Sequence, residues 1–211
     1  MSFFDKVDYY VYTDGSCINN GKKTAKAGLG IYFGPDDPRN THRPIVGKQT
    51  NNIAELSAIK DTYRLIERDV LEGKKIVIYS DSIYGIRCLT TYGKKCADKN
   101  WADSIPNKDL VQETYQLYQD KPNIGFRHIK AHTGLTDIHS LGNENADRLA
   151  NLAIGVESCP YQTKNEKIYL KVPYARKEEV KPLGGKWDKN KKKWYIMDNN
   201  PKKEEVLQIF Q

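Results

Sequence analysis

The sequence contains few cysteines, and their arrangement points neither to a disulfide scaffold nor to a zinc site. Cys17, Cys88, Cys96 and Cys159 are widely spaced, without a CxxC pair. Disulfide frameworks belong mainly to small secreted chains, whereas 211 residues are enough to bury a core without covalent cross-links. We therefore expect free thiols in a reducing compartment.

Long apolar runs are also missing. No stretch approaches the roughly 20 residues that a membrane-spanning helix needs, and the N-terminal sequence MSFFDKVDYY has no cleavable apolar segment. A hydrophobic content of 38% and a charged content of 29% are typical of a globular protein. We expect an intracellular protein, cytoplasmic or nuclear, with no secretion signal and no membrane partner. No pattern indicates an assembly surface, so we expect a monomer.

Positive charge is concentrated near the C-terminal end. Residues 1–160 contain 21 Lys and Arg against 20 Asp and Glu, whereas residues 161–211 contain 13 against 7. The second segment therefore carries +6 of the total net charge of +7. Such an excess favours a polyanionic partner, although a solvated surface without a ligand can have the same composition.

The apolar patterning predicts an α/β domain with a mixed sheet. Strands are expected at residues 9–13, 27–34, 43–47, 75–80 and 124–130, and helices at 51–69, 82–91, 106–119 and 143–155, with a polar, basic stretch at 92–100. A Gly/Asn turn joins the first two strands into a hairpin, while the later strands alternate with helices, which favours parallel pairing. Residues 156–165 lack apolar periodicity. We expect them to link a domain at 1–155 to a small basic α+β domain at 166–211.

Four acidic residues stand at the ends of predicted strands or the starts of predicted helices, although these positions alone do not prove that the four converge. Asp14 and Asp81 follow predicted strands, and Glu55 and Asp147 fall in the first turns of predicted helices. Ligands of open α/β sheets bind at the carboxyl ends of the strands, where four carboxylates would repel one another without cations. Carboxylate oxygens suit Mg²⁺, and two such ions can promote phosphodiester hydrolysis. Each acid also has a structural explanation, as a turn residue, a helix cap or a first-turn acid.

The order and flanking sequences of these acids resemble the type 1 ribonucleases H. The matching segments are TDGS at 13–16, QTNNIAEL at 49–56, YSDS at 79–82, HIKAHTG at 128–134 and GNENADRLA at 142–150. The resemblance covers about residues 8–155 and implies a ribonuclease H-like fold, with a five-stranded mixed sheet and helices on both faces. It implies that the metal ligands are Asp14, Glu55, Asp81 and Asp147.

The same resemblance implies an activity and its cofactor. The enzyme would be an endoribonuclease that hydrolyses the RNA strand of RNA–DNA hybrids, leaving 5′-phosphate and 3′-hydroxyl ends. Two Mg²⁺ ions per site are expected, with Mn²⁺ as a substitute, and the RNA–DNA hybrid is the expected partner. The implied role is removal of RNA from hybrids during DNA replication.

His132 matches the family's mobile-loop histidine, which the resemblance implies assists proton transfer or product release. The segment LTDIHSL between Gly134 and Gly142 is several residues longer than the usual loop. We therefore expect His132 to be held differently, and His139 is an alternative for its role.

The resemblance also implies three sets of contacts with the hybrid. Minor-groove contacts that read the 2′-hydroxyl without reading base sequence are expected from Cys17, Asn19, Asn20, Asn51 and Asn52. A DNA-strand phosphate is expected at Lys48, Thr50 and Asn107, where lysine replaces a common arginine and exchanges a bidentate grip for a point charge. The segment YGKKCADKNW at 92–101 matches a basic protrusion that grips the DNA strand through Lys94, Lys95 and Trp101, although Trp101 is also interpretable as a core residue.

The C-terminal segment resembles a small domain of unknown function that occurs appended to primases and other DNA-processing proteins. The shared features within residues 167–196 are VPY, a glycine pair after a helix, and Trp-Asp followed by a lysine run and Trp-Tyr. A strand at 168–172, a helix at 176–183 and a hairpin around 188–193 are expected. We expect this domain to bind nucleic acid, through lysines with Trp187 or Trp194 stacking, or to bind another protein. The alternative is that both tryptophans form the core of a tiny domain.

Two other functions are compatible with such a fold. One is a nucleic-acid-binding adaptor with an inactive nuclease fold, and the other is a transposase-like carboxylate nuclease. The presence of all four acids argues against the adaptor. The asparagine cluster and the basic insertion argue against the transposase-like enzyme.

Overall fold

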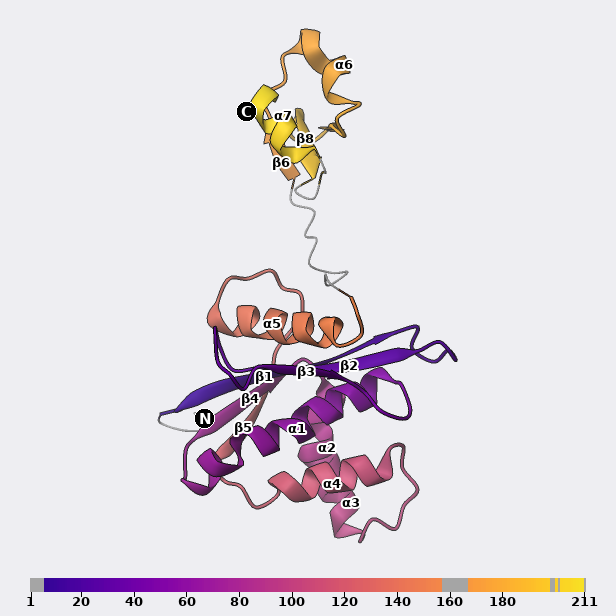
Figure 1. The fold of residues 1–211 in the computed structure, drawn as a ribbon, viewed down its shortest axis with the longest axis vertical. Coiled ribbons are helices and arrows are strands. Elements are labelled where there is room, and N and C mark those ends of the chain that lie inside the picture. The colour runs from indigo at the N-terminus through magenta and orange to yellow at the C-terminus, as the bar shows by residue number, and fades with distance from the viewer. Residues whose placement is uncertain (1–5, 157–166, 198–199, 201, 211) are drawn as a thin grey trace. The chain divides into compact units, whose positions relative to one another are not determined.

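The computed structural model describes residues 6–156, 167–197, 200 and 202–210 (Figure 1). The chain divides into two compact units, residues 1–159 and 160–211. The linker expected at 156–165 lies outside the described residues apart from Val156. Three of the four cysteines fall in the described part, and all three, Cys17, Cys88 and Cys96, are free thiols. None of the helices described is both long and apolar enough to span a membrane.

The first unit is built on a five-stranded mixed sheet with the strand order β3-β2-β1-β4-β5. The strands are β1 (Tyr9–Ile18), β2 (Lys26–Tyr32), β3 (Thr41–Pro44), β4 (Ile76–Ser80) and β5 (Ile124–His128). Strand β2 runs antiparallel to β1 and β3, whereas β4 lies parallel to β1 and β5. The predicted hairpin, followed by parallel strands, is therefore confirmed.

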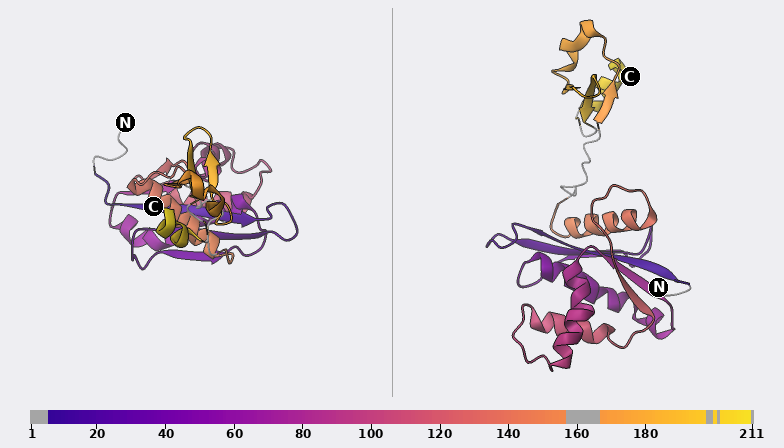
Figure 2. Two further views of the ribbon diagram at one scale, coloured as in Figure 1. Left: turned by 90° about the horizontal axis from the view of Figure 1, so that it is seen from above. Right: turned by 180° about the vertical axis from the view of Figure 1, so that it is seen from behind.

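Helices cover both faces of this sheet, as predicted (Figures 1 and 2). Helix α5 (Ile138–Leu152) lies on one face. The opposite face carries α1 (Asn51–Leu71), α2 (Ile83–Leu89), α3 (Thr91–Asp98) and α4 (Lys108–Tyr118). The sheet is thus enclosed between one helix and a group of four.

Helix α1 begins at Asn51 because the hydroxyl of Thr50 caps it, accepting a hydrogen bond from the Ile53 backbone N–H at 3.3 Å. Its buried side chains recur every three or four residues, so they form one apolar stripe. Within the core they pack with residues of β1, β2 and β4, among them Val11, Leu29 and Ile78. Each fully buried aliphatic side chain contributes about 1.5–3 kcal/mol. This packing fixes the position of α1 relative to the strands of the sheet.

Strand β1 extends five residues beyond its predicted end at Thr13. Parallel pairing with β4 stops at Thr13 and Ser80, whereas antiparallel pairing with β2 continues to Ile18. Asp14 consequently lies inside β1, beside the end of β4, and not at the end of its own strand as predicted. The segment DGSC concealed the extension because its residues are more typical of turns.

Helix α5 begins at Ile138, five residues before its predicted start. Its N-cap is Asp137, whose Oδ1 accepts hydrogen bonds from the backbone N–H groups of His139 and Ser140 at 3.0 and 3.1 Å. The extra residues after Gly134 therefore lengthen mainly the helix, and Asp147 lies well inside it rather than in its first turns. Ile138 and Leu141 remain 66% and 43% exposed, so the new first turn does not bury the apolar stripe that marks a helix in sequence.

Two helices were not predicted. Helix α3 replaces the expected polar stretch at 92–100, and among its residues only Gly93 and Cys96 are buried. Helix α7 (Lys203–Phe210) follows the last strand of the C-terminal unit. Both are eight residues long, which leaves room for only a short apolar pattern.

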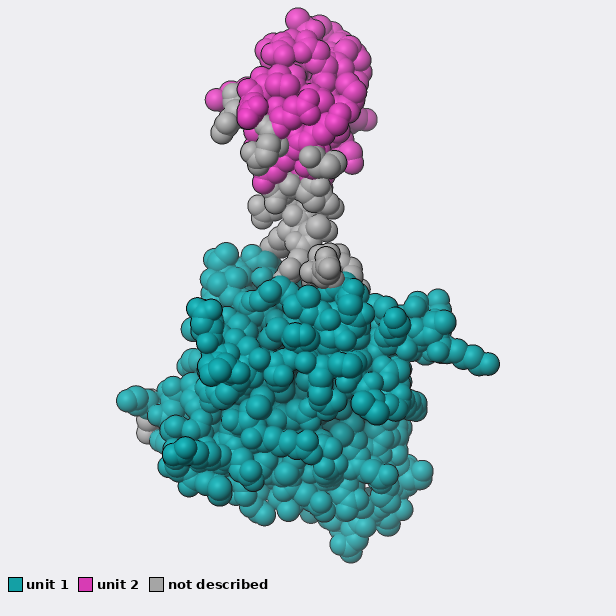
Figure 3. Space-filling view, in the orientation of Figure 1, with its two compact units in different colours: residues 1–159 teal, residues 160–211 magenta. Residues whose placement is uncertain are grey.

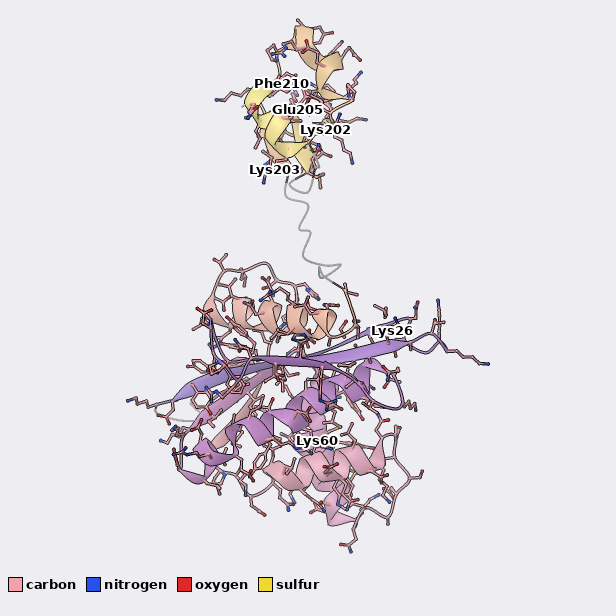
Figure 4. The ribbon with its side chains drawn as sticks, in the orientation of Figure 1. Lys26, Lys60, Lys202, Lys203, Glu205 and Phe210 are labelled. Carbon is pink, nitrogen blue, oxygen red and sulfur yellow. The ribbon has the colours of Figure 1, made fainter. Side chains whose placement is uncertain are left out.

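The C-terminal unit, magenta in Figure 3, is the small α+β domain that the sequence predicts. Its antiparallel sheet has the order β6-β8-β7, and its elements are β6 (Lys167–Leu170), η1 (Tyr174–Arg176), α6 (Lys177–Val180), β7 (Lys186–Asp188), β8 (Lys193–Met197) and α7. Val180, Ile196, Val206 and Phe210, the last labelled in Figure 4, form its buried core with Leu170. Trp194 packs against this core, whereas Trp187 is 49% exposed. The two tryptophans therefore occupy different environments.

Asp188 connects three segments of this unit. Its Oδ2 accepts hydrogen bonds from Lys167 Nζ and the Tyr169 hydroxyl, both at 2.8 Å. Its Oδ1 accepts from the backbone N–H groups of Asn190 and Lys191 at 2.9 and 3.1 Å. The hydrogen bond from Lys167 is the largest of the effects that hold the pKa of Asp188 well below its ordinary value.

Replacing Asp188 with asparagine is expected to lower the melting temperature of the C-terminal unit at pH 7. A depressed folded-state pKa means that the ionised carboxylate stabilises the fold above its unfolded pKa of about 4. This stabilisation falls away as the pH drops from there through the lower folded-state value. Thermal unfolding of the full chain should show a smaller difference between wild type and Asp188→Asn at pH 3 than at pH 7. An equal difference at both pH values would contradict the assignment.

Candidate metal centre

Three carboxylates meet where β1, β4 and α1 come together. Asp14 on β1, Glu55 on α1 and Asp81 directly after β4 each place one oxygen within 4.8 Å of the others. Asp14 and Glu55 are 5% and 6% exposed. Gly15 makes the contact between β1 and α1 feasible, because a Cβ on Gly15 would lie 2.2 Å from the backbone nitrogen of Glu55. A glycine directly after Asp14 is therefore part of how the site is built.

The electrostatics of the cluster favour a cation. Burial raises the pKa of Asp14 well above its ordinary value, and the carboxylate of Glu55 raises it further. Burial likewise raises the pKa of Glu55, followed by the charge of Asp81. Burial is also the main reason that the pKa of Asp81 is raised. A divalent cation would remove both the repulsion and the desolvation penalty of such oxygens.

Asp147 approaches the same cluster from α5. Its charge raises the pKa of Asp14, of Glu55 and of Asp81, so it acts on all three carboxylates. Asp147 Oδ2 and Glu55 Oε2 are buried and have no hydrogen-bond partner among the described residues. Buried carboxylate oxygens without donors are costly, and hard oxygen ligands suit Mg²⁺ or Mn²⁺. The residues present therefore fit a divalent metal ion.

Side-chain amides orient these carboxylates. Asn151 Nδ2 donates to Asp147 Oδ1 at 2.8 Å, and Asn151 Oδ1 accepts from the Ser16 hydroxyl at 2.8 Å. Asn51 Nδ2 donates to Glu55 Oε1 at 3.2 Å. A hydrogen bond from the buried side chain of Asn143 lowers the pKa of Asp81.

Asn143, Asn151 and Ser16 were not predicted as residues of the site. A signal was present for the two asparagines, because Asn143 and Asn151 stand four residues before and after Asp147. On a helix, that spacing places all three side chains on one face. Ser16 gave no such signal, because its contact depends on how α5 packs on the sheet.

The two candidate histidines lie in different surroundings. His132 is exposed, has a left-handed backbone with φ of 50°, and its charge lowers the pKa of Asp81. His139 stacks on Tyr79 with ring centroids 4.3 Å apart, and its Nδ1 and Nε2 lie 3.1 and 3.3 Å from the hydroxyls of Tyr12 and Tyr79. Both nitrogens of His139 are thus engaged with tyrosines, whereas His132 acts on Asp81 through its charge.

The residues expected to read the minor groove lie on β1, the turn after it and the start of α1. Asn20 Oδ1 accepts a hydrogen bond from the Asn51 backbone N–H at 3.4 Å, which joins the turn to the helix start. Asn19 and Asn52 are exposed, and Asn19 adopts a left-handed φ of 53°. Cys17 is half-buried within β1. Of these residues, Asn51 contacts the Glu55 carboxylate directly, and Asn20 is joined to Asn51 through the backbone N–H of Asn51.

The residues expected to hold a phosphate are only partly brought together. Lys48 and Asn107 line one pocket of about 430 Å³, which also includes Lys60 of α1. Lys60, labelled in Figure 4, is engaged by Glu113, with Nζ 2.8 Å from Oε2. Thr50 is not among the lining residues, and its hydroxyl serves as the cap of α1.

The expected basic protrusion is helix α3 and the turn after it. Lys94 and Lys95 are exposed, and Lys94 Nζ lies 3.0 Å from Asp98 Oδ1. Trp101 meets Tyr115 edge-on with ring centroids 5.9 Å apart. It also packs against the buried cluster of Leu56, Cys88 and Val111. The structure thus supports the interpretation of Trp101 as a core anchor, with part of its surface still accessible.

The fold and the carboxylate cluster define a family that comparison with known proteins identifies. Residues 6–154 match the RNase H family, and residues 167–205 match DUF5710, a domain of unknown function. The chain belongs to the RNase H family, as its motifs predict. The solution structure of the PFV RNase H domain superposes with a TM-score of 0.58 at 23% identity, covering 72% of this chain and 96% of that one, which shows the shared fold.

Curated relatives place the chain with the type 1 enzymes. It is 41% identical over 145 residues to Ribonuclease H of Schizosaccharomyces pombe, covering 66% of this chain and 50% of that protein. It is 36% identical over 144 residues to Ribonuclease H1 of Mus musculus, covering 66% and 48%. The chain thus spans about half the length of these relatives.

Proposed function

We propose that this protein cleaves the RNA strand of RNA–DNA hybrids at a metal centre formed by Asp14, Glu55, Asp81 and Asp147. The observation that carries the proposal is the buried carboxylate cluster with unpartnered oxygens, in a chain of the RNase H family. Two Mg²⁺ ions, or Mn²⁺ in their place, would activate the attacking water and stabilise the leaving oxygen. The products would be 5′-phosphate and 3′-hydroxyl ends, and the cellular role removal of RNA from hybrids during replication.

The chain's own residues supply position and substrate selection. The amides of Asn51, Asn143 and Asn151 hold the carboxylates that bind metal. His132, which is exposed and whose charge lowers the pKa of Asp81, would move a proton or assist product release. The polar side chains of the β1 turn and the start of α1 would read the 2′-hydroxyl of the RNA strand. Contacts with the DNA strand would come from Lys48 and Asn107 and from the exposed lysines of α3.

Cleavage of a panel of substrates tests the proposed specificity. The full chain would be incubated with Mg²⁺ and end-labelled RNA that is single-stranded, annealed to RNA or annealed to DNA. We expect cleavage of the hybrid alone, with fragments that carry 5′-phosphate and 3′-hydroxyl ends. Cleavage of single-stranded or duplex RNA at a similar rate would contradict the specificity. Tight hybrid binding without cleavage in Mg²⁺ or Mn²⁺ would instead indicate a binding protein with an inactive nuclease fold.

Replacing Asn151 with alanine is expected to reduce hybrid cleavage about 10- to 100-fold, as removal of a residue that orients a metal ligand typically does. The variant loses the side-chain amide that donates to Asp147 Oδ1, and also the contact with Ser16. Because Asn151 acts through a metal ligand, the Mg²⁺ concentration for half-maximal rate should also rise.

Asn145→Ala is the matched control. Asn145 is half-buried on the same helix, where its Nδ2 donates to the Leu141 carbonyl and its Oδ1 accepts from Arg148, so it does not contact the carboxylate cluster in either hydrogen bond. It should leave both the rate and the Mg²⁺ dependence close to wild type. A rate loss for Asn151→Ala with an unchanged Mg²⁺ dependence would contradict a role in orienting Asp147 and would indicate that Asn151 only stabilises the fold.

A further inference from the structure

The C-terminal unit contains a concave surface whose lining is both aromatic and basic. A pocket of about 590 Å³ lies against β6, the segment after it and the β7–β8 hairpin, and its aromatic and lysine residues include Lys171, Tyr174, Trp187, Lys192, Lys193 and Trp194. We name these six residues the aromatic–lysine pocket. The pocket belongs to a domain whose family description gives no function.

The aromatic rings of this pocket are arranged in two layers. Trp194 packs against the core of the unit. Trp187 contacts Trp194 edge-on, with the two ring centroids 5.6 Å apart and an interplanar angle of 63°. Trp187 is nevertheless 49% exposed, and Tyr174 is 83% exposed. Covering exposed aromatic rings with a flat partner is favourable, because it removes their apolar surface from water, and rings held in a fixed position lose little entropy on binding. The pocket therefore offers stacking surfaces.

The lysines of the pocket form no ion pair among the described residues. Lys171, Lys192 and Lys193 are exposed, and no ion pair joins them to an acidic residue within the described part of the unit. By contrast, Lys167 and Lys181 of the same unit are paired, at 2.8 Å, with Asp188 and Glu178.

The surroundings of the pocket add to its positive potential. Lys177 Nζ lies 4.2 Å from the centroid of the Tyr174 ring. None of the described residues that line the pocket is acidic. Residues 161–211 carry a net charge of +6. The charge of this surface is therefore complementary to a polyanion.

We propose that the aromatic–lysine pocket binds single-stranded nucleic acid. Bases stack on Trp187 and Tyr174, and phosphates contact Lys171, Lys192 and Lys193. Internal bases of a duplex already have both faces covered by their neighbours, so only an unpaired strand can use exposed rings. Stacking does not depend on base identity, so the site selects for strandedness rather than sequence. This site is separate from the carboxylate cluster and does not require the proposed cleavage activity.

Fluorescence anisotropy with labelled oligothymidine and oligouridine of roughly 12 nucleotides tests this proposal on the full chain. We expect binding to both strands, weaker binding to a blunt DNA duplex, and quenching of tryptophan fluorescence on binding. The two oligonucleotides distinguish DNA from RNA as the preferred source of the unpaired strand. Trp187→Ala should weaken binding about 10-fold or more, whereas Trp187→Phe should retain most of it because a flat ring remains.

The lysines are tested by salt dependence with a matched control. The double variant Lys192→Gln/Lys193→Gln should reduce the slope of log affinity against log salt by about 1.4, since each lost contact with a single strand removes about 0.7. Lys186→Gln/Lys189→Gln removes the same charge from lysines that do not line the pocket, and should leave the slope closer to wild type. Circular dichroism would confirm that all variants are folded.

Three results would overturn the proposal. One is binding that Trp187→Ala and the Lys192/Lys193 pair leave unchanged relative to the control pair. Another is equal affinity for single strands and duplex. The third is displacement of oligothymidine by polyglutamate of equal charge, which would indicate an acidic protein partner instead.

Discussion

Asp14→Asn is expected to raise the melting temperature of the metal-free protein while abolishing hybrid cleavage. The carboxylate of Asp14 is buried beside Glu55, Asp81 and Asp147, and all three raise its pKa. A folded-state pKa above the unfolded value means that the ionised group destabilises the fold at neutral pH. Asparagine keeps the shape and the Oδ1 that accepts from the Gly15 N–H at 2.7 Å, but removes one charge.

The expected magnitudes differ strongly between the two readouts. If the substitution removes about 1 kcal/mol of unfavourable electrostatic free energy from the folded state, the melting temperature would rise by roughly 2–4 °C in a chain of this size. Loss of a metal ligand should lower the cleavage rate on the order of 10³-fold or more. Thermal unfolding with a chelator and with Mg²⁺ measures the first effect, and hybrid cleavage measures the second.

Asp120→Asn serves as the control for charge removal, since Asp120 is exposed and lies outside the cluster. It should change neither stability nor activity. The stability gain of Asp14→Asn should also shrink when Mg²⁺ is added, because the metal ion neutralises the wild-type cluster. An Asp14→Asn protein that is less stable than wild type in chelator would show that the four carboxylates do not destabilise the fold by repelling one another.

Gly15→Ala is expected to lower both stability and activity. A Cβ at this position would lie 2.2 Å from the Glu55 backbone nitrogen and 2.6 Å from the Ala54 carbonyl carbon. Both are backbone atoms, so α1 must move away from β1 to accommodate the methyl group. Overpacking of this kind costs about 1–3 kcal/mol, and displacement of Glu55 should reduce cleavage by roughly 10-fold or more.

Gly73→Ala separates the effect of close packing from that of backbone conformation. Gly73 follows α1 with φ of 81°, and a methyl group added there would meet no atom within 4 Å. Its substitution should cost only the strain of a left-handed residue, about 1–2 kcal/mol, and leave hybrid cleavage unchanged. Urea unfolding and hybrid cleavage of both variants give the comparison. Full activity in Gly15→Ala would contradict the role of this contact in placing Glu55.

The parts of the site that the sequence could predict are those carried by local patterns. Each of the four acids stands in a short motif that resembles the family, and the structure brings one oxygen each of Asp14, Glu55 and Asp81 within 4.8 Å of one another. The start of α5 could not be predicted in this way, since Asp137 caps a turn whose apolar residues Ile138 and Leu141 stay exposed. A helix start that buries few apolar side chains shows little apolar periodicity in the sequence.

The remaining details depend on contacts between segments far apart in the chain. The bond between Ser16 and Asn151 joins residues 135 positions apart. The division of roles between Trp187 and Trp194 depends on which one faces the core of the C-terminal unit. Local propensity contains no information on such choices, because packing decides them.

The rate of hybrid cleavage by the full chain as a function of Mg²⁺ concentration, with Asp81→Asn measured in parallel, tests the proposed metal centre most directly. We expect a rate that rises with Mg²⁺ to saturation, is abolished by chelator, and is lost at every Mg²⁺ concentration in the Asp81→Asn protein. Cleavage that persists in chelator, or that survives the Asp81→Asn substitution, would contradict the carboxylate cluster as the metal centre.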